Sequence, residues 1–530
     1  MECTAFIISY GVLIFSILVG DVMDSQWKRF FIIIIILFSS LCGLICAFNA
    51  FIDTYNIFNL PRFIGINYFA VKSENVERLC KPINVIDKKP EVIFLGNSKT
   101  DFAIDPYHYT KLTGSSSVYN FAVRNAEPYE LYQFITHALN NNPNLNTIFL
   151  AIDFEMFITS TEKVAGFDED QIGKTHITLD NFFKSELSLD ALQNNLFALK
   201  MNHIKRYDYP SFEDNGKFSD GALGAIFIDE ASFLKNTRNF FIMAHESGTL
   251  NYEKFKILGV IVKLCDENQI NLKVFIPPVH AIHIKAYSAY KNLYEEWLTK
   301  LVEIVPVIDF VSCDEIASID PDLPINDNRY FWDSAHVKTI VGNLMIERLV
   351  GKSDNYGNSV NTNNVREHLD NLWQSIDEFD KNFPSISKKC EIIGKFSREI
   401  PINLLNNANA SQYVKLDHSD IRTVNNANII RIMGKILIDE TQVNNVYLFL
   451  KDDEEHHFYT MVSKQWKSGD ITWKSLIKDN SNENYYKFFA EAILNGITEG
   501  DYDLFIVYED KDNNLNISPI LMNFSLKDMR

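Results

Sequence analysis

The stretch Val92–Ser98, with the sequence VIFLGNS, decides the fold class of the chain. Four consecutive apolar residues that end in Gly are typical of a buried parallel strand leading into a loop. Similar apolar runs occur at Thr147–Asp153, Leu272–Pro278 and Val305–Phe310, each after a stretch with helical periodicity. Strands that alternate with helices predict an α/β domain with a parallel sheet, whose functional groups gather at the carboxyl ends of the strands.

Two further helices follow these strands. Apolar residues between Val337 and Met345 recur with the i, i+3, i+4, i+7 spacing of a helix face, and Gly351 marks the end of that helix. Residues 352–364 read as a polar linker. An amphipathic helix is predicted from Val365 to the proline at position 384. We therefore expect the α/β domain at 85–351 and the linker with its helix at 352–384.

The remainder, residues 385–530, changes to short strand-like runs. Val446–Leu450 and Tyr502–Tyr508 are bounded by turn residues, and Asn516–Phe524 is a candidate closing strand. Short strands with frequent turns predict a β-sandwich. Some of its aromatic residues are candidates to stack on sugar rings, although packing within the sandwich is the commoner role. These candidates are Trp466, Trp473, Tyr485 and Tyr486.

The N-terminal region, residues 1–53, is a predicted membrane anchor. Phe30–Ile52 contains no charged residue and exceeds the roughly 20 residues that cross a hydrocarbon core. Lys28 and Arg29 precede it, so the positive-inside rule places the rest of the chain outside the cytoplasm, in the periplasm or at the cell surface, after a tether at 54–84. Two alternatives stay open. The uncharged Cys3–Gly20 is a second span, or Met23 is the true start of an uncleaved signal anchor.

Composition excludes several classes of protein. The 530 residues are 46% hydrophobic and 22% charged, which is typical of globular domains and not of a mainly disordered chain. The formal net charge of −19 argues against a general nucleic-acid binder. Seven cysteines without a CxxC pair favour neither a disulfide scaffold nor a structural zinc site. We therefore predict no metal and no cofactor.

Two short motifs carry candidate chemistry. Ser98 follows the first strand directly, where its hydroxyl would be exposed beside amides able to hold an oxyanion. In Asp333-Ser334-Ala335-His336, at the opening of the last helix of the α/β domain, Asp333 can hold the Nδ1–H of His336 and leave Nε2 as a general base. Each motif also has a plain interpretation, Ser98 as a loop residue and Asp333 as a helix N-cap. Together they favour a Ser-His-Asp triad.

With both motifs in place, residues 85–351 resemble the SGNH hydrolase superfamily. The resemblance is closest to its membrane-anchored members that acylate extracellular polysaccharides, such as alginate acetylation proteins and the teichoic-acid D-alanyl transfer protein. It implies a three-layer αβα fold, with Ser98 as nucleophile, His336 as general base and Asp333 as the residue that orients it. The segments that carry it are Gly96–Ser98 and Asp333–His336, supported by Tyr119–Ala122, Leu150–Phe157 and Phe275–His280.

The chain departs from the family pattern at two points. Asn97 stands where the family usually has Asp, and Ala122–Asn125 lacks the glycine whose amide usually joins the oxyanion hole. Asn125 is a candidate donor in its place, and Arg124 a candidate to stabilise negative charge or to bind an acidic sugar. His280, after two prolines, is a candidate to line the cleft. For each of these residues an ordinary loop role remains the alternative.

Two functions of different class remain. The first is a membrane-anchored O-acyltransferase or esterase outside the cytoplasm, with acetyl as the favoured acyl group. It acts on a cell-surface polysaccharide, and the family resemblance implies a multi-pass membrane acyltransferase as its partner. The second is a non-catalytic scaffold or carbohydrate-binding subunit that retains the SGNH fold. A metal-dependent hydrolase has little support, because Asp333 and His336 have no third ligand at a suitable spacing.

Overall fold

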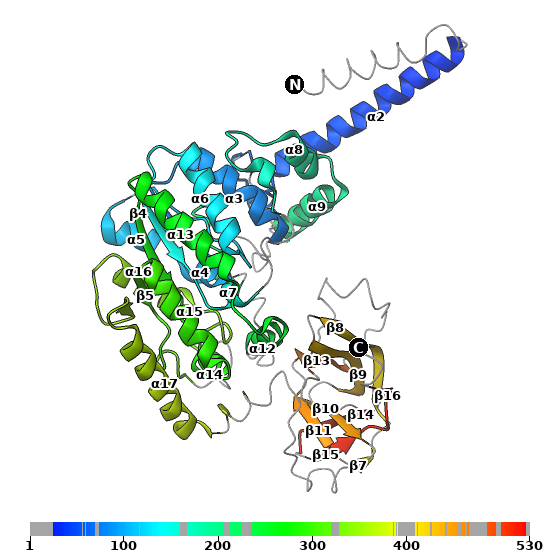
Figure 1. Ribbon diagram of the computed structural model, residues 1–530. Coiled ribbons are helices and arrows are strands. Elements are labelled where there is room, and N and C mark those ends of the chain that lie inside the picture. The colour runs from blue at the N-terminus through cyan, green and yellow to red at the C-terminus, as the bar shows by residue number, and fades with distance from the viewer. Residues whose placement is uncertain are drawn as a thin grey trace.

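The computed structural model of the protein contains an N-terminal helix, an α/β domain and a C-terminal β region (Figure 1). The described residues are 25–55, 57–58, 60–68, 74–115, 117–159, 167–204, 213–221, 223, 233, 235–319, 328–384, 386–387, 390, 409–410, 412–424, 427–439, 443–452, 457–461, 464–465, 485–493, 500–512 and 514–525. Cys3–Gly20, Met23, Trp466 and Trp473 lie outside these residues. Tyr485 and Tyr486 begin strand β13, but their side chains are not among the described ones.

A six-stranded sheet forms the centre of the α/β domain, with the order β2-β1-β3-β4-β5-β6. The first five strands are parallel, and β6 is antiparallel to β5. The strands are β1 (Val92–Leu95), β2 (Val118–Asn120), β3 (Thr147–Ala151), β4 (Asn271–Ile276), β5 (Val307–Asp309) and β6 (Asn358–Val360). The four predicted strands correspond to β1, β3, β4 and β5. The prediction of a polar linker at 352–364 is wrong at Asn358–Val360, because these residues form the edge strand β6 and pair with β5.

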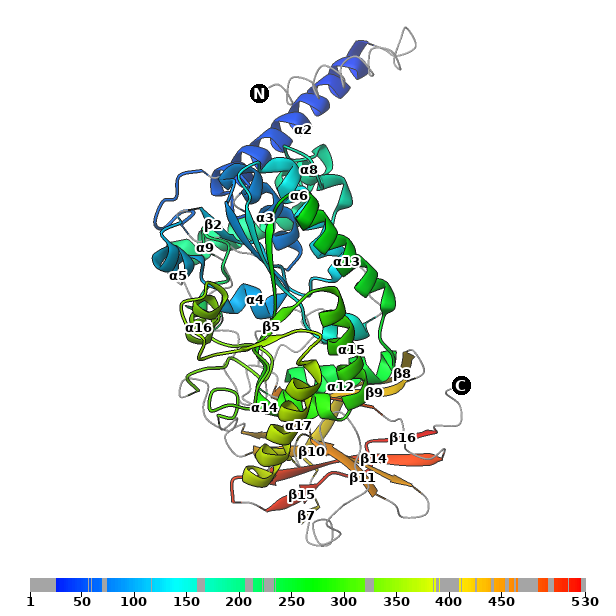
Figure 2. The ribbon, with the colours of Figure 1, turned by 60° about the vertical axis from the view of Figure 1, so that its left-hand side comes forward.

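Helices cover the sheet on both faces, with α13 and α15 on one side and α5 and α16 on the other (Figure 2). The helices of this domain are α3 (Glu74–Lys88), α4 (Ser98–Ala103), α5 (Pro106–Thr113), α6 (Pro128–Asn141), α7 (Glu155–Ile158), α12 (Lys235–Ser247), α13 (Tyr252–Glu267), α14 (Ala281–Ser288), α15 (Lys291–Ile304), α16 (Thr339–Leu349) and α17 (Val365–Asn382). A 3₁₀ turn lies at Glu169–Gln171. All four residues of β1 are buried, as expected for a parallel strand covered on both faces.

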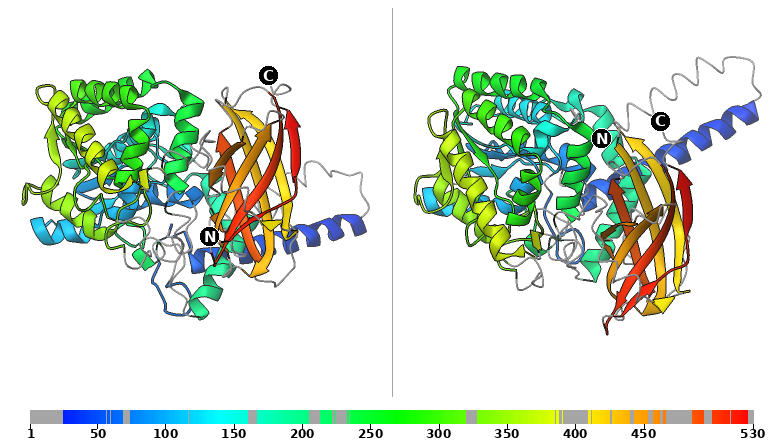
Figure 3. Two further views of the ribbon diagram at one scale, coloured as in Figure 1. Left: turned by 90° about the horizontal axis from the view of Figure 1, so that it is seen from below. Right: turned by 60° about the horizontal axis from the view of Figure 1, so that its bottom comes forward.

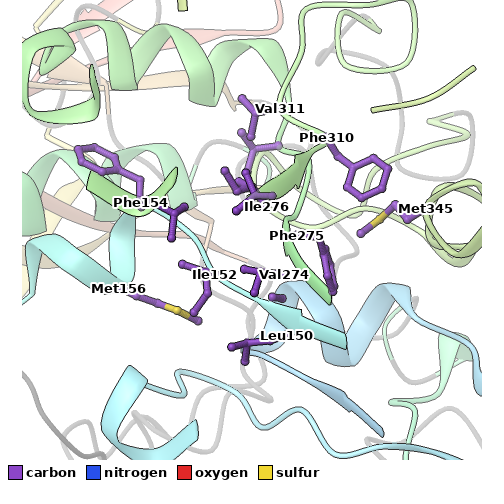
Figure 4. Close-up of a cluster of buried hydrophobic side chains, with 14 of the residues drawn as sticks. Leu150, Ile152, Phe154, Met156, Val274, Phe275, Ile276, Phe310, Val311 and Met345 are labelled. Carbon is purple, nitrogen blue, oxygen red and sulfur yellow. The ribbon is translucent and has the colours of Figure 1, made fainter. Parts of the chain in front are cut away.

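The core of the domain lies around the ends of the central strands. Leu150 and Ile152, in and just after β3, lie beside Val274 and Ile276 of β4 (Figure 4). Phe154 closes the cluster and is almost fully buried. The predicted amphipathic helix is confirmed as α17, and the residues of its apolar face are buried. This packing fixes the strand ends from which the candidate site is built.

Helix α2 (Ser25–Ile52) projects from the α/β domain (Figure 1). Its residues Arg29–Ile52 are long and apolar enough to cross a membrane, and no other helix among the described residues meets that test. The segment predicted as a tether, 54–84, is more ordered than expected. It includes most of α3 and a stretch in which Tyr55 and Ile57 are buried. These two side chains pack against α3 and against Ala191 of helix α9 (Leu189–His203), which orders the segment.

The C-terminal region consists of two sheets, whose strands are visible in Figure 3. One has the order β11-β10-β14-β15-β7 with β16 paired to β14, and the other the order β12-β13-β9-β8. Their strands are β7 (Asn409–Ala410), β8 (Val414–Val424), β9 (Ala427–Asp439), β10 (Val443–Asp452), β11 (His457–Met461), β12 (Lys464–Gln465), β13 (Tyr485–Ile493), β14 (Asp501–Asp510), β15 (Leu515–Ile517) and β16 (Met522–Ser525). The expected closing strand is split in two, because Ser518 leaves the ladder to bond Ile506. Residues of both sheets share one buried cluster.

Candidate active site

The turn after β1 presents Ser98 at the carboxyl end of the sheet. Gly96 has no room for a side chain, since a Cβ there would lie 2.3 Å from Thr100 Oγ1. Asn97 is the N-cap of α4, and its side-chain oxygen accepts the backbone N–H of Lys99 at 3.0 Å. Ser98 is the first residue of that helix and is half-buried. The tight turn and the cap together fix the direction of its hydroxyl.

Ser98, His336 and Asp333 form one hydrogen-bonded series. Ser98 Oγ lies 2.8 Å from His336 Nε2, and His336 Nδ1 lies 2.9 Å from each carboxylate oxygen of Asp333. The Asp333 side chain is fully buried, whereas the His336 side chain is 11% exposed. In this order a carboxylate fixes the imidazole tautomer and leaves Nε2 facing the serine. The structure thus brings together the three residues that the two sequence motifs single out.

A short turn, Phe331–Val337, holds the acid and the histidine in register. Its two end residues form an antiparallel bridge. Asp333 Oδ1 accepts the backbone N–H groups of Ala335 and His336 at 2.8 and 2.9 Å. Helix α16 begins only at Thr339, so the prediction that this motif opens the helix is corrected. The Asp caps its own turn, which holds His336 before the helix starts.

Asn236 is a member of the site that the sequence does not reveal. It lies on α12, and its side-chain amide donates to Asp333 Oδ2 at 2.7 Å. Together with the two backbone donors and the imidazole, it gives the buried carboxylate a full set of hydrogen bonds, which a buried charge requires. Its sequence distance from Asp333 is 97 residues, and no motif surrounds it. Only the fold places it here.

Asn97 has a second contact on the far side of Ser98. Its side-chain N–H donates to Asp153 Oδ2 at 2.7 Å, while its oxygen caps α4. Asp153 follows β3, and Lys99 Nζ lies 3.1 Å from its Oδ2. An Asp at position 97 has no hydrogen to donate when ionised, so the amide matches a carboxylate at position 153. Asn97 thus has a local partner that an ionised Asp at this position would lack.

The same lysine leads into a buried polar network. Lys99 Nζ also lies 2.9 Å from Glu155 Oε1, which is 2.9 Å from His283 Nε2 and accepts the hydroxyl of Tyr287 at 2.8 Å. Burial lowers the pKa of Lys99, but the adjacent carboxylates Asp153 and Glu155 outweigh it and raise this pKa. Burial likewise raises the pKa of Glu155, yet the charge of Lys99 and the contact with His283 lower it overall. These side chains are therefore charged partners that satisfy one another.

The backbone amides of Ser98 and of Asn125, in the turn after β2, have no hydrogen-bond partner within the described part of the chain. The other amides of the turn after β2 are engaged. Ala122 donates to Asn120 Oδ1, Val123 to the Gly96 carbonyl and Arg124 to Glu77 Oε2. Asn125 has φ 56°, a left-handed conformation that Asn adopts more readily than most residues. Asn125 is thus the better oxyanion candidate of this turn.

Arg124 and His280 have structural partners that differ from their predicted roles. Arg124 Nε donates to Glu77 Oε1 at 2.8 Å, and its guanidinium lies over the ring of Phe218, so its charge is already compensated. His280 is the fully buried N-cap of α14, and its Nε2 lies 2.7 Å from the carbonyl of Ile319. Burial lowers the pKa of His280 to about 4. The expectation that His280 lines the cleft is therefore wrong.

The remaining side of the triad is apolar and tightly packed. Phe102 lies with its ring centroid 4.9 Å from that of His336, and it shares a buried cluster with Trp332. Helix α16 approaches α4 closely at Gly342, where a Cβ would lie 1.9 Å from the carbonyl oxygen of Ala103. The helix that carries Ser98 and the helix that follows His336 are thus in backbone contact.

No group of three or more His, Cys, Asp and Glu side chains suited to a metal ion is present in the described ranges.

In comparisons with known proteins, no protein-family model matches the chain and no curated protein is similar enough to count as a relative. The function has to be inferred from the site itself.

Proposed function

We propose that the protein is a membrane-anchored SGNH-like serine O-acyltransferase or esterase that acts on a cell-surface polysaccharide. The observation that carries the proposal is the series from Ser98 through His336 to Asp333, with heavy-atom distances of 2.8 and 2.9 Å. The strand order β2-β1-β3-β4-β5, with Ser98 after the first strand and His336 after the fifth, supports it. In such sheets, ligands bind outside the carboxyl ends of the strands.

The chemistry follows from the positions of the atoms. His336 Nε2 removes the proton of Ser98 as the hydroxyl oxygen attacks the carbonyl carbon of an ester. Asp333 stabilises the imidazolium that forms. The same imidazolium then gives its proton to the leaving alkoxide, and an acyl-serine results. In the second half, His336 takes a proton from water or from a sugar hydroxyl, whose oxygen attacks the acyl carbon. The bond from that carbon to Ser98 Oγ breaks, and the imidazolium returns the proton to Oγ.

The negative oxygen of the tetrahedral intermediate needs donors that are not already engaged. We assign this role to the amides of Ser98 and Asn125, which have no partner within the described residues. They follow β1 and β2, which are neighbours in the sheet, and Val123 N–H bonds the Gly96 carbonyl between the two turns at 3.1 Å. Arg124 is less suited, because Glu77 holds its side chain.

The location and the partners are part of the same proposal. Helix α2 crosses the membrane, and Arg29 before its apolar part keeps that end in the cytoplasm and the site outside, in the periplasm or at the cell surface. The two C-terminal sheets form a β-sandwich around their shared cluster and bind the polymer. A multi-pass membrane acyltransferase supplies the acyl group, with acetyl favoured. The protein needs no cofactor.

A non-catalytic scaffold remains the second candidate, because Asn97 and Ala122–Asn125 depart from the family pattern. The two are separated by labelling of the full-length protein with a fluorophosphonate probe and by release of p-nitrophenol from its acetate. We expect both activities in the native protein. The control variant Ser115→Ala should keep both, because Ser115 lies near the start of β1, at the end of the strand opposite to Ser98; the nearby Ser117 carbonyl accepts the N–H of Val92 there. Ser98→Ala should lose both. If native protein is neither labelled nor active, the enzyme proposal fails and the scaffold remains.

A further inference from the structure

Exposed apolar side chains gather around the end of α2 at which the chain enters the α/β domain. They belong to residues 58 and 60–68 and to the helices α8 (Leu179–Glu186) and α9 (Leu189–His203). The most exposed are Ile64 at 71%, Leu179 at 68% and Leu189 at 73%, values similar to those along α2 itself. We call this set, residues 58 and 60–68 with α8 and α9, the apolar collar.

Outside α2, most of the exposed large hydrophobic side chains of the described residues belong to the apolar collar. Elsewhere in the described residues, exposed large hydrophobic side chains occur at isolated positions. These are Tyr107, Ile204 directly after α9, Tyr252, Val260, Ile340, Tyr413 and Ile520. Single apolar residues on a surface need no explanation, but a contiguous apolar surface marks an interaction site.

Hydrogen bonds attach the apolar collar to the last turn of α2. Asn49 donates to the carbonyl of Glu186 at 2.9 Å and accepts from Asn195 of α9 at 3.1 Å. Arg62 bonds the carbonyl of Asp53, and Asn67 bonds that of Phe51. The loop and both helices therefore surround the end of α2 at the level of residues 49–53.

That level corresponds to the edge of a bilayer. The candidate membrane span of α2 has 24 residues, Arg29–Ile52. At about 1.5 Å per residue it is roughly 36 Å long, against roughly 30 Å for a hydrocarbon core. About one turn of the helix thus extends into the headgroup region. Aromatic residues favour this zone, and Trp27 at one end and Phe63 and Tyr68 at the other are exposed.

We propose that the apolar collar inserts into the outer interface of the lipid bilayer, so that the protein sits on the membrane by a surface as well as by α2. The proposal rests on the crossing of the membrane by α2 and extends it. Lipid is the occupant that the position favours, because the elements of the collar are bonded to the end of the candidate membrane-spanning helix α2. Burial in the interface would remove from water the side chains that are otherwise unexplained.

The proposal has a consequence for the candidate site. Tyr55 and Ile57 pack with Cys80 of α3 and with Ala191 of α9, so the collar is joined to the α/β domain by buried contacts. A collar held in the interface fixes the orientation of the domain relative to the bilayer. The catalytic turn is then kept at one height, and acceptor groups close to the membrane are favoured over those far out on a polymer.

The test uses the full-length protein in nanodiscs of phosphatidylcholine and phosphatidylglycerol. Three cysteines of the N-terminal region and Cys313 are replaced by Ser; the others, at positions 80, 265 and 390, are buried. Single exposed positions are then changed to Cys and labelled with a nitrobenzoxadiazole fluorophore. Ile64→Cys and Leu196→Cys report on the collar, Leu37→Cys on α2, and Val260→Cys and Tyr107→Cys are matched exposed controls. All should unfold at the temperature of the unlabelled protein.

We expect doxyl-labelled lipid to quench the collar positions at least about threefold more than the two controls, and to quench Leu37→Cys as well. Aqueous iodide should show the reverse order. If Leu37→Cys is quenched and the collar is not, the collar proposal fails while the anchor stands. If the collar is shielded from both quenchers, protein covers it, either residues 3–20 or a second copy, and the proposal also fails. If Leu37→Cys is not quenched, both proposals fail.

Discussion

Two histidines of the α/β domain each contact a carboxylate, and the two regions differ in what lies on the other side of the ring. His336 contacts Asp333 through Nδ1 and faces Ser98 through Nε2. His283 contacts Glu155 through Nε2 at 2.9 Å, and its Nδ1 lies 3.3 Å from Ser334 Oγ. The first ring is partly exposed and the second is fully buried.

The difference shows that a histidine–carboxylate pair by itself does not face a group that a substrate could reach. Ser334 is fully buried and its Oγ already accepts the hydroxyl of Thr237 at 2.9 Å, so His283 faces no group that a substrate could reach. Glu155 in turn is shared with Lys99. The His283 region is a closed set of polar partners, whereas the His336 region ends at a half-buried hydroxyl. Proton transfer to a substrate is possible only in the second case.

The largest effect is expected from a change to the pair of His336 and Asp333. Asp333→Asn should lower kcat/KM for p-nitrophenyl acetate by about 10³–10⁴-fold, because the amide no longer holds the imidazole in the tautomer that accepts a proton from Ser98. The matched control is Asp309→Asn, which alters another buried carboxylate, 2.8 Å from His368 Nε2. Equal losses in the two variants would show that Asp333 has no special role.

A smaller effect is expected on the Asn97 side of the nucleophile. Asn97→Asp would place a carboxylate next to Asp153 and remove the donor of a 2.7 Å hydrogen bond. Repulsion should displace Ser98 and lower kcat/KM about tenfold or more. The exchanged variant, Asn97→Asp with Asp153→Asn, restores a donor–acceptor pair and should recover most of the activity in the same assay. A double variant no better than Asn97→Asp would refute this coupling.

A change to the pair of His283 and Glu155 should alter the stability of the protein but not its catalytic rate. Glu155→Gln removes the charge that Lys99, His283 and Tyr287 share, and should lower the free energy of unfolding by about 1–3 kcal/mol. The folded fraction should keep kcat/KM within about threefold, since no reacting atom is touched. Urea unfolding and titration with the fluorophosphonate probe measure the two quantities. Activity lost without a change in unfolding would place Glu155 in the catalytic machinery.

The smallest effect concerns pH and a third pair, His368 and Asp309. Burial lowers the pKa of His368, but the hydrogen bond and charge of Asp309 outweigh it and raise this pKa above its ordinary value. The folded state then binds the proton more tightly. Its contribution to stability is present below about pH 6.5 and is lost as pH rises through the folded-state pKa. The melting temperature of His368→Gln should therefore fall less between pH 6 and about pH 8 than that of the native protein. A parallel fall would contradict the prediction.

Sequence patterns predicted the parallel strands and the residues of the triad because both depend on local signals. An apolar run that ends in Gly marks β1, and an Asp three residues before a His places two side chains on one turn.

The rest depends on contacts between distant segments. Asn236 reaches Asp333 from α12 and His283 reaches Glu155 from α14, and nothing in the sequence around either residue marks it. His280 and His283 cannot be told apart by sequence, because only the fold decides which of the two faces Glu155. Lys99 and Glu155 carried a weak signal, since one follows Ser98 and the other follows β3 at its carboxyl end. The strand β6 was hidden because its three residues are mainly polar.

The contact between Gly342 and the carbonyl of Ala103 has a consequence for how the protein can vary. The backbones of α16 and α4 touch there, so a methyl group at position 342 would push apart the two segments that carry His336 and Ser98. Under the proposed function, a saturation-mutagenesis screen would therefore find position 342 as sensitive as Ser98 or His336, although Gly342 is not one of the three residues of the triad. The absence of a side chain at position 342 helps to set the distance between Ser98 and His336.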